Sequence, residues 1–376
     1  MKFKRYRIAD LLDEISMGPF GSNIKKECFV ETGVPVLNGS NLTGIALNDD
    51  EFRYVTEEKA DSLGKANAHR SDVVVTHRGT LGQISFIPET SKYERYVISQ
   101  SQFRFRCNEK VLPEYLTYYF HTRKGQYDLL SNASQVGVPA LARATTTFQQ
   151  LEVEIPDIVE QHKIVEIFEN FRKKMEINIK INNNLEQQAQ AIYQQMFIEN
   201  QNPNWKEGKL SDLVAVKYGK DHKKLDGGCY PVYGSGGIMR YVEKPLYTGE
   251  SVLIPRKGTL NNVMYVNGAF WSVDTMFYTE MLRPNIAKFV YHFVKGKDLA
   301  SLNAGSAVPS MTTNILNAMP LYVPDDKTLS IFEETVTPMY SQMQENEKQS
   351  ANLANIRDTL LPRLMSGELE VSDIDL

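Results

Sequence analysis

The chain has few cysteines and no long apolar run, and both features limit what the protein can be. Its three cysteines, Cys28, Cys107 and Cys229, are isolated, without the spacing of a zinc site or the even count of a disulfide framework. This pattern predicts reduced thiols in a cytoplasmic protein. No apolar run reaches about 18 residues, so no membrane span is expected. The basic residues 1–7 lack the apolar core of a signal peptide.

The sequence also lacks recognisable catalytic and cofactor motifs. It contains no G-x-x-x-x-G-K-[ST] phosphate loop and no G-x-G-x-x-G after a predicted strand. The six histidines show no metal-ligand spacing, no serine lies in G-x-S-x-G, and no acidic cluster forms a defensible nuclease site. Residues 202–205, Asn-Pro-Asn-Trp, lie in a polar stretch and are better interpreted as an anchor for Trp205 than as a methyltransferase motif. We therefore predict a binding protein without a catalytic site, metal or cofactor of its own.

The charge balance is close to neutral, yet it contains local basic loops. The net charge is −4, so the molecule as a whole does not resemble a nucleic-acid binder. Residues 21–26 and 217–224 nevertheless concentrate lysines at similar early positions of two halves of the chain. Such patches can neutralise phosphates, although a solvated surface is the commoner explanation for a run of charge.

Two long stretches carry apolar residues in alternating steps of three and four, and they lie 168 residues apart in the same register. This spacing places one stripe on one helix face, as in a coiled coil. The polar interruption is shared, because Asn178 is matched by Asn346, and a buried Asn fixes pairing and register. The seam positions are Phe171, Met175, Asn178, Leu185, Ile192, Met339, Met343, Asn346, Leu353 and Leu360.

Equivalent helices in a duplicated chain can pack antiparallel about a pseudo-two-fold axis. A paired segment of about 28 residues would span roughly 42 Å, more than one turn of DNA. The alternative is a pair of ordinary amphipathic helices, each covering its own domain. In the second helix we expect a break or kink at Thr337–Pro338 and a bend or an end at Pro362, because proline removes a helical donor.

The duplication extends into the globular parts of the chain. Residues 73–87 parallel residues 252–266 as strand, tight basic turn and strand, and residues 134–140 parallel residues 306–310. Short strands combined with a helix near 113–130, and again near 284–299, predict an α+β class. The predicted organisation is a globular domain over 1–156, a helical region over 157–198, a linker over 199–208, a second globular domain over 209–324, a second helical region over 325–366 and an acidic tail over 367–376.

The paired basic turns and their neighbouring loops are the candidates for nucleic-acid contact. Arginine can bind guanine or phosphate, amides suit base edges, and hydroxyl or backbone N–H groups can hold phosphate. Plain turn chemistry or a solvated hairpin tip is the alternative for each of them. The candidates are Lys25, Lys26, Asn38, Ser40, Asn41, His77, Arg78, Thr80, Lys220, Lys223, Lys224, Ser235, Arg256, Lys257 and Thr259.

Several segments, in their order along the chain, resemble those of the specificity subunits of type I restriction-modification systems. They are residues 15–22, 34–42, 78–81, 156–161, 230–238 and 357–368, and the resemblance covers essentially the whole chain. It implies two target recognition domains, each reading one half of a bipartite double-stranded DNA sequence. It also implies an antiparallel coiled coil of two long helices that sets the gap and docks two copies of an adenine methyltransferase subunit.

The same resemblance implies that a restriction and translocation subunit joins the complex, and that methyl donor, Mg²⁺ and ATP belong to the partners. Two other functions remain open from the residues alone. One is a coiled-coil adaptor that binds proteins and lacks DNA specificity. The other is a self-sufficient methyltransferase or nuclease, which the missing motifs disfavour.

Overall fold

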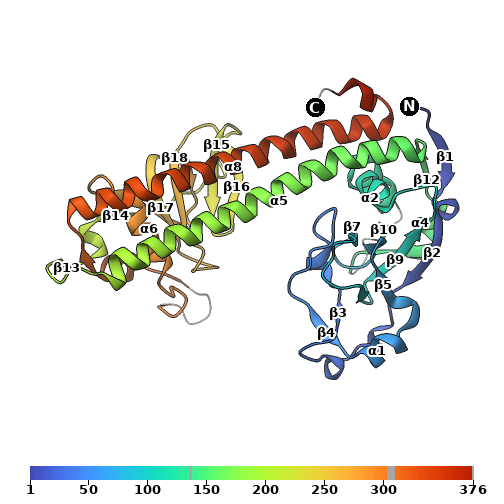
Figure 1. Ribbon diagram of the computed structural model, residues 1–376, viewed down its shortest axis with the longest axis horizontal. Coiled ribbons are helices and arrows are strands. Elements are labelled where there is room, and N and C mark those ends of the chain that lie inside the picture. The colour runs from blue at the N-terminus through green and yellow to red at the C-terminus, as the bar shows by residue number, and fades with distance from the viewer. Residues whose placement is uncertain (132, 135–137, 303–309, 375–376) are drawn as a thin grey trace. The chain divides into compact units, whose positions relative to one another are not determined.

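The structure, a computed structural model, describes residues 1–131, 133–134, 138–302 and 310–374, and it divides into two compact units (Figure 1). Unit 1 combines Met1–Glu176 with Gln349–Leu376, and unit 2 is Ile177–Lys348. Both units mix helices and strands, which confirms the predicted α+β class. Most of the parallel between 134–140 and 306–310, and the last two residues of the acidic tail, lie outside the described residues. Within the described part, no helix has both the length and the apolar character needed to cross a membrane.

The globular part of unit 1 contains two four-stranded sheets, in the orders β2-β9-β6-β7 and β4-β3-β8-β5, and the two-stranded pairs β1-β12 and β10-β11. The strands are β1 (Lys4–Arg7), β2 (Leu12–Met17), β3 (Val34–Val36), β4 (Arg53–Val55), β5 (Asn67–His69), β6 (Asp72–Thr76), β7 (Ile84–Phe86), β8 (Arg95–Val97), β9 (Gln102–Cys107), β10 (Ala133–Ser134), β11 (Ala140–Leu141) and β12 (Glu152–Ile155). β6 is buried along its whole length, as its run of β-branched valines predicts.

The helices of this globular part are α1 (Glu57–Ser62), α2 (Pro113–His121), α3 (Arg123–Leu130) and α4 (Ala144–Gln150). The single helix expected near 113–130 is therefore two helices. Thr122 leaves the helical conformation, with ψ of 160°, and its hydroxyl accepts a hydrogen bond from the Gly125 N–H. A threonine in this position ends one helix and caps the next.

The globular part of unit 2 is built on one six-stranded sheet, in the order β14-β19-β17-β18-β15-β16, and the pair β13-β20. The strands are β13 (Lys206–Lys209), β14 (Val214–Tyr218), β15 (Tyr230–Gly234), β16 (Gly237–Val242), β17 (Tyr247–Pro255), β18 (Met264–Ser272), β19 (Met276–Met281) and β20 (Pro320–Val323). Its helices are α6 (Ala287–Lys295) and α7 (Thr313–Asn317).

The two globular parts repeat one strand arrangement. The order β2-β9-β6-β7 corresponds to β14-β19-β17-β18, and β3, like β15, has one antiparallel and one parallel neighbour. The register is also repeated, because Val73 pairs with Phe86 in unit 1 and Val252 pairs with Tyr265 in unit 2. The connection expected as a tight turn is longer, since residues 77–83 and 256–263 separate the paired strands.

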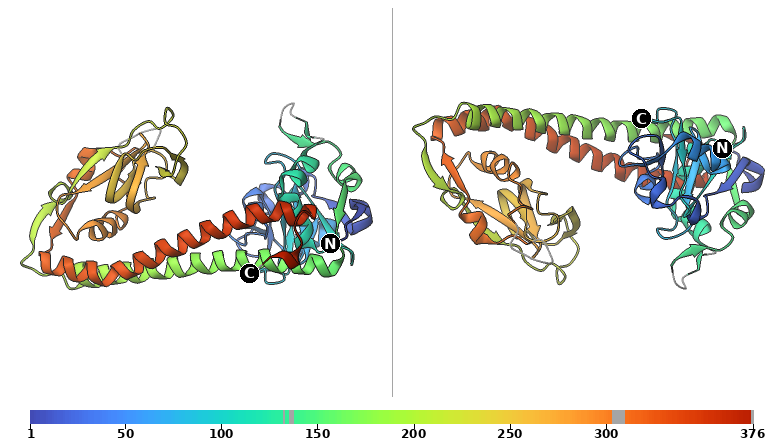
Figure 2. Two further views of the ribbon diagram at one scale, coloured as in Figure 1. Left: turned by 90° about the horizontal axis from the view of Figure 1, so that it is seen from above. Right: turned by 90° about the horizontal axis from the view of Figure 1, so that it is seen from below.

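Two long helices, α5 (Ile158–Gln194) and α8 (Asp326–Ser366), contribute to both units. In unit 2 the Asn178 amide donates to the Asn346 carbonyl at 3.2 Å, and the Asn182 amide donates to the Met343 carbonyl at 3.1 Å. Rising numbers on α5 thus meet falling numbers on α8, so the helices are antiparallel, as predicted. Figure 2 shows this yellow-green part of α5 beside the orange-red part of α8.

The heptad positions lie on the inner sides of these helices. Asn178 and Asn346 are buried, and the other seam residues are partly buried. By contrast, Ile177 and Ile181 on α5 are 48% and 39% exposed. Side chains at the other end of α5 and α8, such as Phe168 and Leu364, belong to the core of unit 1.

Helix α8 is continuous through both of its internal prolines, so it neither breaks at Thr337–Pro338 nor ends at Pro362. Pro338 and Pro362 are exposed, whereas Val336, Tyr340 and Leu364 are buried. A backbone carbonyl that loses its helical donor on an exposed side can bond to water, and packing of the opposite side holds the helix together. The helix ends at Ser366, and Gly367 follows it with a φ of 75°, the left-handed conformation typical of a helix terminus.

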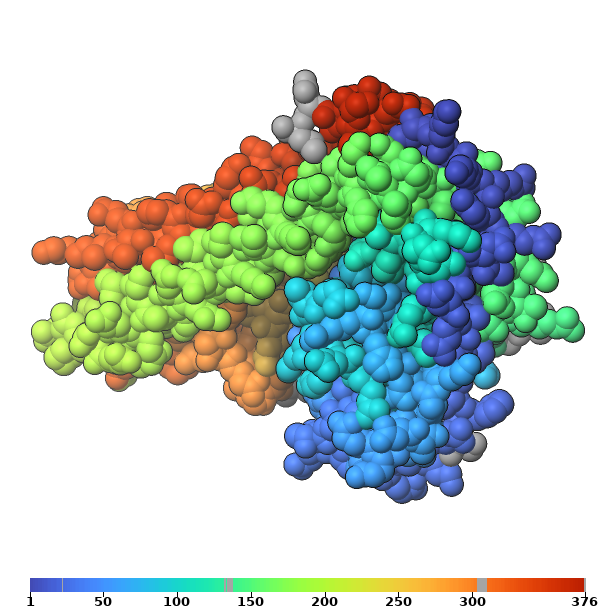
Figure 3. Space-filling view, turned by 45° about the vertical axis from the view of Figure 1, so that its right-hand side comes forward, coloured from blue at the N-terminus to red at the C-terminus, as the bar shows by residue number. Residues whose placement is uncertain are grey.

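The N-terminus of the chain packs beside this helix end within unit 1 (Figure 3). The Met1 ammonium group pairs with Glu370, and a Cβ atom at Gly367 would lie 2.7 Å from the Phe3 ring. The chain ends of unit 1 are therefore part of its packing.

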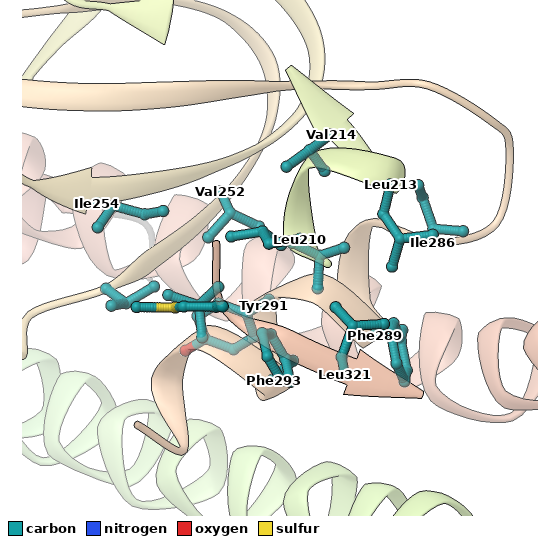
Figure 4. Packing of buried hydrophobic residues seen from close by; sticks show 14 of the residues in the cluster. Leu210, Leu213, Val214, Val252, Ile254, Ile286, Phe289, Tyr291, Phe293 and Leu321 are labelled. Carbon is teal, nitrogen blue, oxygen red and sulfur yellow. The ribbon is translucent and has the colours of Figure 1, made fainter. Parts of the chain in front are cut away.

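The core of unit 2 joins its globular part to both long helices. Figure 4 shows side chains of the sheet and of α6, including Val252, Ile254 and Phe289, directed towards one another. The same cluster contains Phe332 from α8 and Phe197 from the π-helix Gln195–Glu199 that continues α5. These contacts make the second globular part and its helix ends one packed body.

A histidine lies fully buried in this body. His292 is 0% exposed; its Nδ1 lies 2.7 Å from Gln190 Oε1 and its Nε2 lies 2.9 Å from the Tyr340 hydroxyl. A neutral ring satisfies both contacts, donating from Nδ1 and accepting at Nε2. Burial lowers the pKa of His292 to about 4, and Glu186 opposes this only in part.

Acid should therefore destabilise unit 2 through His292. Because its folded pKa lies below the ordinary value of 6.5, the unfolded chain binds the proton first. The stability from the neutral ring is complete above about pH 6.5 and is lost as the pH falls towards about 4. Between pH 7 and pH 5 the wild type should lose about 2 kcal/mol more unfolding free energy than His292→Gln. Urea unfolding at both pH values measures this difference, and equal losses would contradict it.

Candidate nucleic-acid interface

Three loops of unit 2 that carry candidate residues lie together. The Asn262 amide donates to the Ser235 carbonyl at 2.6 Å, and a Cβ atom at Gly258 would lie 3.3 Å from the Ser235 hydroxyl. The Arg256 guanidinium lies over the Tyr218 ring, 5.2 Å from its centroid. The loop at 217–224, the turn at Ser235 and the loop at 256–263 therefore form one surface, which we call loop cluster 2.

Loop cluster 2 is basic and accessible. Lys220, Lys223, Lys224, Lys257 and Thr259 are exposed, and Arg256 and Ser235 are half-buried. Asp221 is the acidic residue within the lysine-rich loop, and hydrogen bonds from backbone N–H groups, chiefly that of Lys223, lower the pKa of its carboxyl group. The lysine and arginine side chains of loop cluster 2 are therefore available to bind a polyanion.

Unit 1 brings its candidate loops together in a similar way. A Cβ atom at Gly39 would lie 3.2 Å from the Thr80 hydroxyl, so the loop at 38–42 adjoins the loop at 77–83. Gln100 links the loop at 77–83 to the loop at 21–26. Its carbonyl lies 3.2 Å from His77 Nε2, and its side chain lies against Gly21. We call this surface loop cluster 1. Lys25, Lys26, Arg78 and Thr80 are exposed in it.

The two clusters are held by equivalent backbone hydrogen bonds. The Leu141 N–H donates to the His77 carbonyl at 2.9 Å, and the Met311 N–H donates to the Arg256 carbonyl at 2.9 Å. Arg78 and Lys257 each form an isolated bridge just beyond these residues, with Ala140 and Ser310. These basic loops are therefore fixed to a neighbouring segment.

The basic loops also begin in the same way. A Cβ atom at Gly18 would lie 1.9 Å from the Ser99 carbonyl oxygen, and one at Gly219 would lie 2.0 Å from that of Val273. Only glycine permits such a close approach of two backbones. The repeated glycine thus positions the loop that follows in each unit.

In loop cluster 1 the structure corrects the assignment of Asn41, whereas His77 remains a candidate contact. Asn41 is buried at 0% exposure; its Oδ1 accepts from the Asn38 N–H, and its Nδ2 donates to the carbonyls of Asn48 and Asp50. Its amide is used to fold the loop, so we assign it a structural role. His77 is half-buried, and burial lowers the pKa of its ring, so it is neutral at pH 7 and adds no positive charge.

Two aromatic residues that were not among the predicted contacts lie beside the basic loops. Tyr218 supports Arg256, as described above, and Phe20 is 84% exposed immediately before the loop of unit 1. The sequence pattern that could have indicated such residues is an aromatic residue next to a glycine and a run of lysines, as in Lys217-Tyr-Gly-Lys220. Exposed rings can stack on bases or cover sugar surfaces.

The side chains of both clusters are of kinds that can bind anions and contact base edges. Each combines flexible ammonium groups, an arginine, and hydroxyl or amide groups on loops fixed to a sheet. Arginine and lysine suit phosphate and guanine, and the other groups suit backbone or base contacts. The described residues contain no group of three or more His, Cys, Asp or Glu side chains placed to hold a metal ion.

Comparison with known proteins agrees with this arrangement. The family described as the type I restriction modification DNA specificity domain matches residues 3–187 and 202–350. The MjaIX type I restriction enzyme specificity subunit of Methanocaldococcus jannaschii is 20% identical over 370 residues, which cover 86% of this chain and 83% of that protein. The HindI specificity subunit of Haemophilus influenzae is 23% identical over 180 residues, covering 47% of this chain and 34% of that protein.

A solved structure shares the fold. The crystal structure of the S subunit of a type I restriction-modification system from M. genitalium matches with a TM-score of 0.57 at 17% sequence identity, over 96% of each chain. The family match covers most of the chain and falls on both halves of the repeat. The chain therefore belongs to the family of type I restriction-modification DNA specificity subunits.

Proposed function

We propose that this specificity subunit reads a bipartite double-stranded DNA target, one half with each loop cluster. The observation that carries the proposal is a repeated backbone with different side chains. His77 and Arg256 occupy equivalent positions, as do Arg78 and Lys257, within the same hydrogen-bonding frame. A shared frame would present each loop to DNA in the same way, and different side chains would select different bases.

Binding has two parts in this proposal. Exposed lysines such as Lys25, Lys26 and Lys257 contact phosphates, which gives affinity that depends on salt and not on sequence. Arginine, serine and asparagine side chains, among them Arg78, Arg256 and Ser235, then discriminate base edges, each good pair contributing about 1–3 kcal/mol. The other proposed contacts are Asn38, Ser40, Thr80, Lys220, Lys223, Lys224 and Thr259.

The paired helices set the distance between the two half-sites. Residues 1–156 and 209–324 are the proposed target recognition domains, and 157–198 and 325–366 are the coiled-coil regions. The hydrogen-bonded asparagines in the seam support a fixed register. A rigid connection raises the effective concentration at the second half-site only when the spacing fits.

Chemistry is supplied by other subunits in this proposal. Two copies of an adenine methyltransferase subunit dock on the helices, and a restriction and translocation subunit completes the complex in the cytoplasm. The chain itself is non-catalytic. Ile177 and Ile181, exposed and four residues apart on α5, support a docking surface on this helix.

Methylation mapping of a strain with and without this gene tests the proposal. Methylated adenines should define one asymmetric motif with two constant parts and a gap of fixed length. That motif should disappear when the gene is deleted, and it should return with a plasmid copy. A strain lacking the methyltransferase gene is the control and should lose the same motif. An unchanged methylation pattern after deletion would overturn the proposal.

A further inference from the structure

Helix α6 of unit 2 carries an unusual set of buried polar side chains where it meets both long helices. Lys288 is 3% exposed and His292 is 0% exposed, although charged and polar groups are rarely buried without partners. Their neighbours Tyr291 and Lys295 lie on the same short helix. The partners of these four side chains come from four other elements: β17, β18, α5 and α8.

Lys288 joins α6 to the sheet and to α8. Its ammonium group lies 3.0 Å from Glu250 Oε1 on β17 and forms an ion pair with Glu333 on α8. The Tyr265 hydroxyl donates to the same Glu250 carboxylate. The ammonium group also lies 5.2 Å from the centroid of the Tyr265 ring and 5.7 Å from that of Tyr340. One cation thus holds three elements.

The other side chains join α6 to α5 as well. His292 contacts Gln190 of α5 at 2.7 Å and Tyr340 of α8 at 2.9 Å. Glu186 of α5 accepts hydrogen bonds from both Tyr291 and Lys295. Every one of these bonds crosses from the globular part of unit 2 to a long helix. Together with the Lys288 contacts they form what we call the α6 network.

Such a network adds little to stability but much to orientation. Removing two charges from water offsets most of their mutual attraction, and apolar groups of similar volume often stabilise a site as well or better. The bonds are directional, however, and a rotation or slide of α6 would leave Lys288 or Glu333 buried without a partner. An apolar contact alone would tolerate such a slide, because dispersion and hydrophobic attraction are not directional.

Among the described residues, unit 1 is attached to its long helices through fewer directional contacts of the same kind. The Tyr118 hydroxyl on α2 donates to Glu169 Oε1 on α5 at 3.1 Å, and Gln161 on α5 accepts from the Leu112 N–H at 2.9 Å. A polar attachment of the globular part to the helices is therefore a feature of each unit. The attachment described for unit 2 contains more charged side chains than the one described for unit 1.

We propose that Lys288, His292 and Glu333 are positioning residues that fix the orientation of the second recognition domain on the helix pair and so restrict the subunit to one gap length. This rests on the proposed function, since a gap exists only if two half-sites are read. None of the three residues needs to touch DNA. Their effect is on which spacing lets both loop clusters bind at once, and it leaves the bases that each cluster selects unchanged.

The test is a double substitution, K288M with E333M, assayed in the full complex with the methyltransferase. Methionine keeps the length of both side chains and removes both buried charges. On a library of targets whose gap varies one base pair at a time, methylation at gaps one base pair longer or shorter should rise by about tenfold relative to the best gap. Both half-site sequences should remain as in the wild type. A folded variant that keeps the wild-type gap profile would overturn the proposal.

A matched control and a second variant keep the test decisive. K163M with E160M removes an exposed ion pair of α5, whose Nζ–Oε1 distance is 2.7 Å, and it should leave the gap profile unchanged. Tyr340→Phe removes only the hydroxyl that contacts His292, and it should also broaden the gap profile. If K288M/E333M does not fold, a folded Tyr340→Phe protein with an unchanged gap profile still overturns the proposal. A wild type with no gap preference would instead count against the proposed function.

Discussion

Replacing Arg256 and Lys257 together with alanine should weaken binding of the target DNA by about a hundredfold, since a base contact of about 1–3 kcal/mol at Arg256 and a phosphate contact at Lys257 are both lost. Arg256 is held over Tyr218, so its guanidinium is already oriented in the free protein. Lys257 is exposed beside it and fixed by its bridge to Ser310. Anisotropy of labelled DNA at one fixed salt concentration, with the purified methyltransferase complex, measures the change.

A charge-matched variant separates local contact from general electrostatics. Lys206 and Lys244 are exposed in unit 2 and lie outside loop cluster 2. Their double alanine variant removes the same charge and should weaken binding by less than about tenfold, because charges beyond about 8–10 Å are largely screened. Competition with DNA scrambled in one half-site should show that the Arg256 and Lys257 variant loses discrimination at one half only. Equal losses in both variants would contradict direct readout by this loop.

The pairing of the long helices was predictable because it depends on local periodicity. Alternating steps of three and four fix the apolar face of a helix, whatever lies elsewhere in the chain. The shared polar position at Asn178 and Asn346 then indicated which faces meet. Their hydrogen bond in the structure follows from the same chemistry, since a buried amide needs a partner.

The repeated strands were predictable for a similar reason. Runs of β-branched residues such as Val73–Val75 indicate a buried strand, and Val252–Ile254 repeat them. The length of the connection between the strands was not predictable, because the loop is held by Ala140 and Ser310 from distant segments. The prediction of a tight turn was wrong on this account.

Other features depend on contacts between residues far apart in the sequence. The course of α8 through Pro338 depends on packing of its opposite face, which local propensity does not contain. Asn41 carries an amide that suits a base edge and a turn equally well, and only its burial decides between them. The α6 network joins Lys288 to Glu250 and Glu333, and no spacing in the sequence brings these residues together.

Lengthening the helix pair without altering either unit tests most directly whether the paired helices set the gap between the half-sites. We would insert one heptad after Glu176 in α5 and one heptad after Lys348 in α8. Both positions lie at the boundary between the two units, so the contacts within each unit are kept. The insertion adds about 10 Å of paired helix, equivalent to at most about three base pairs of DNA. Insertion into α5 alone is the control; it shifts the part of α5 that belongs to unit 1 by seven residues against the unaltered α8 and should abolish methylation of the target.

Methylation mapping of the double-insertion strain gives the answer. Two half-site sequences identical to those of the wild type, now separated by a longer gap, are the predicted result. Altered half-sites, or an unchanged gap in an active and folded complex, would contradict the claim that two reading domains are spaced by a paired-helix connection.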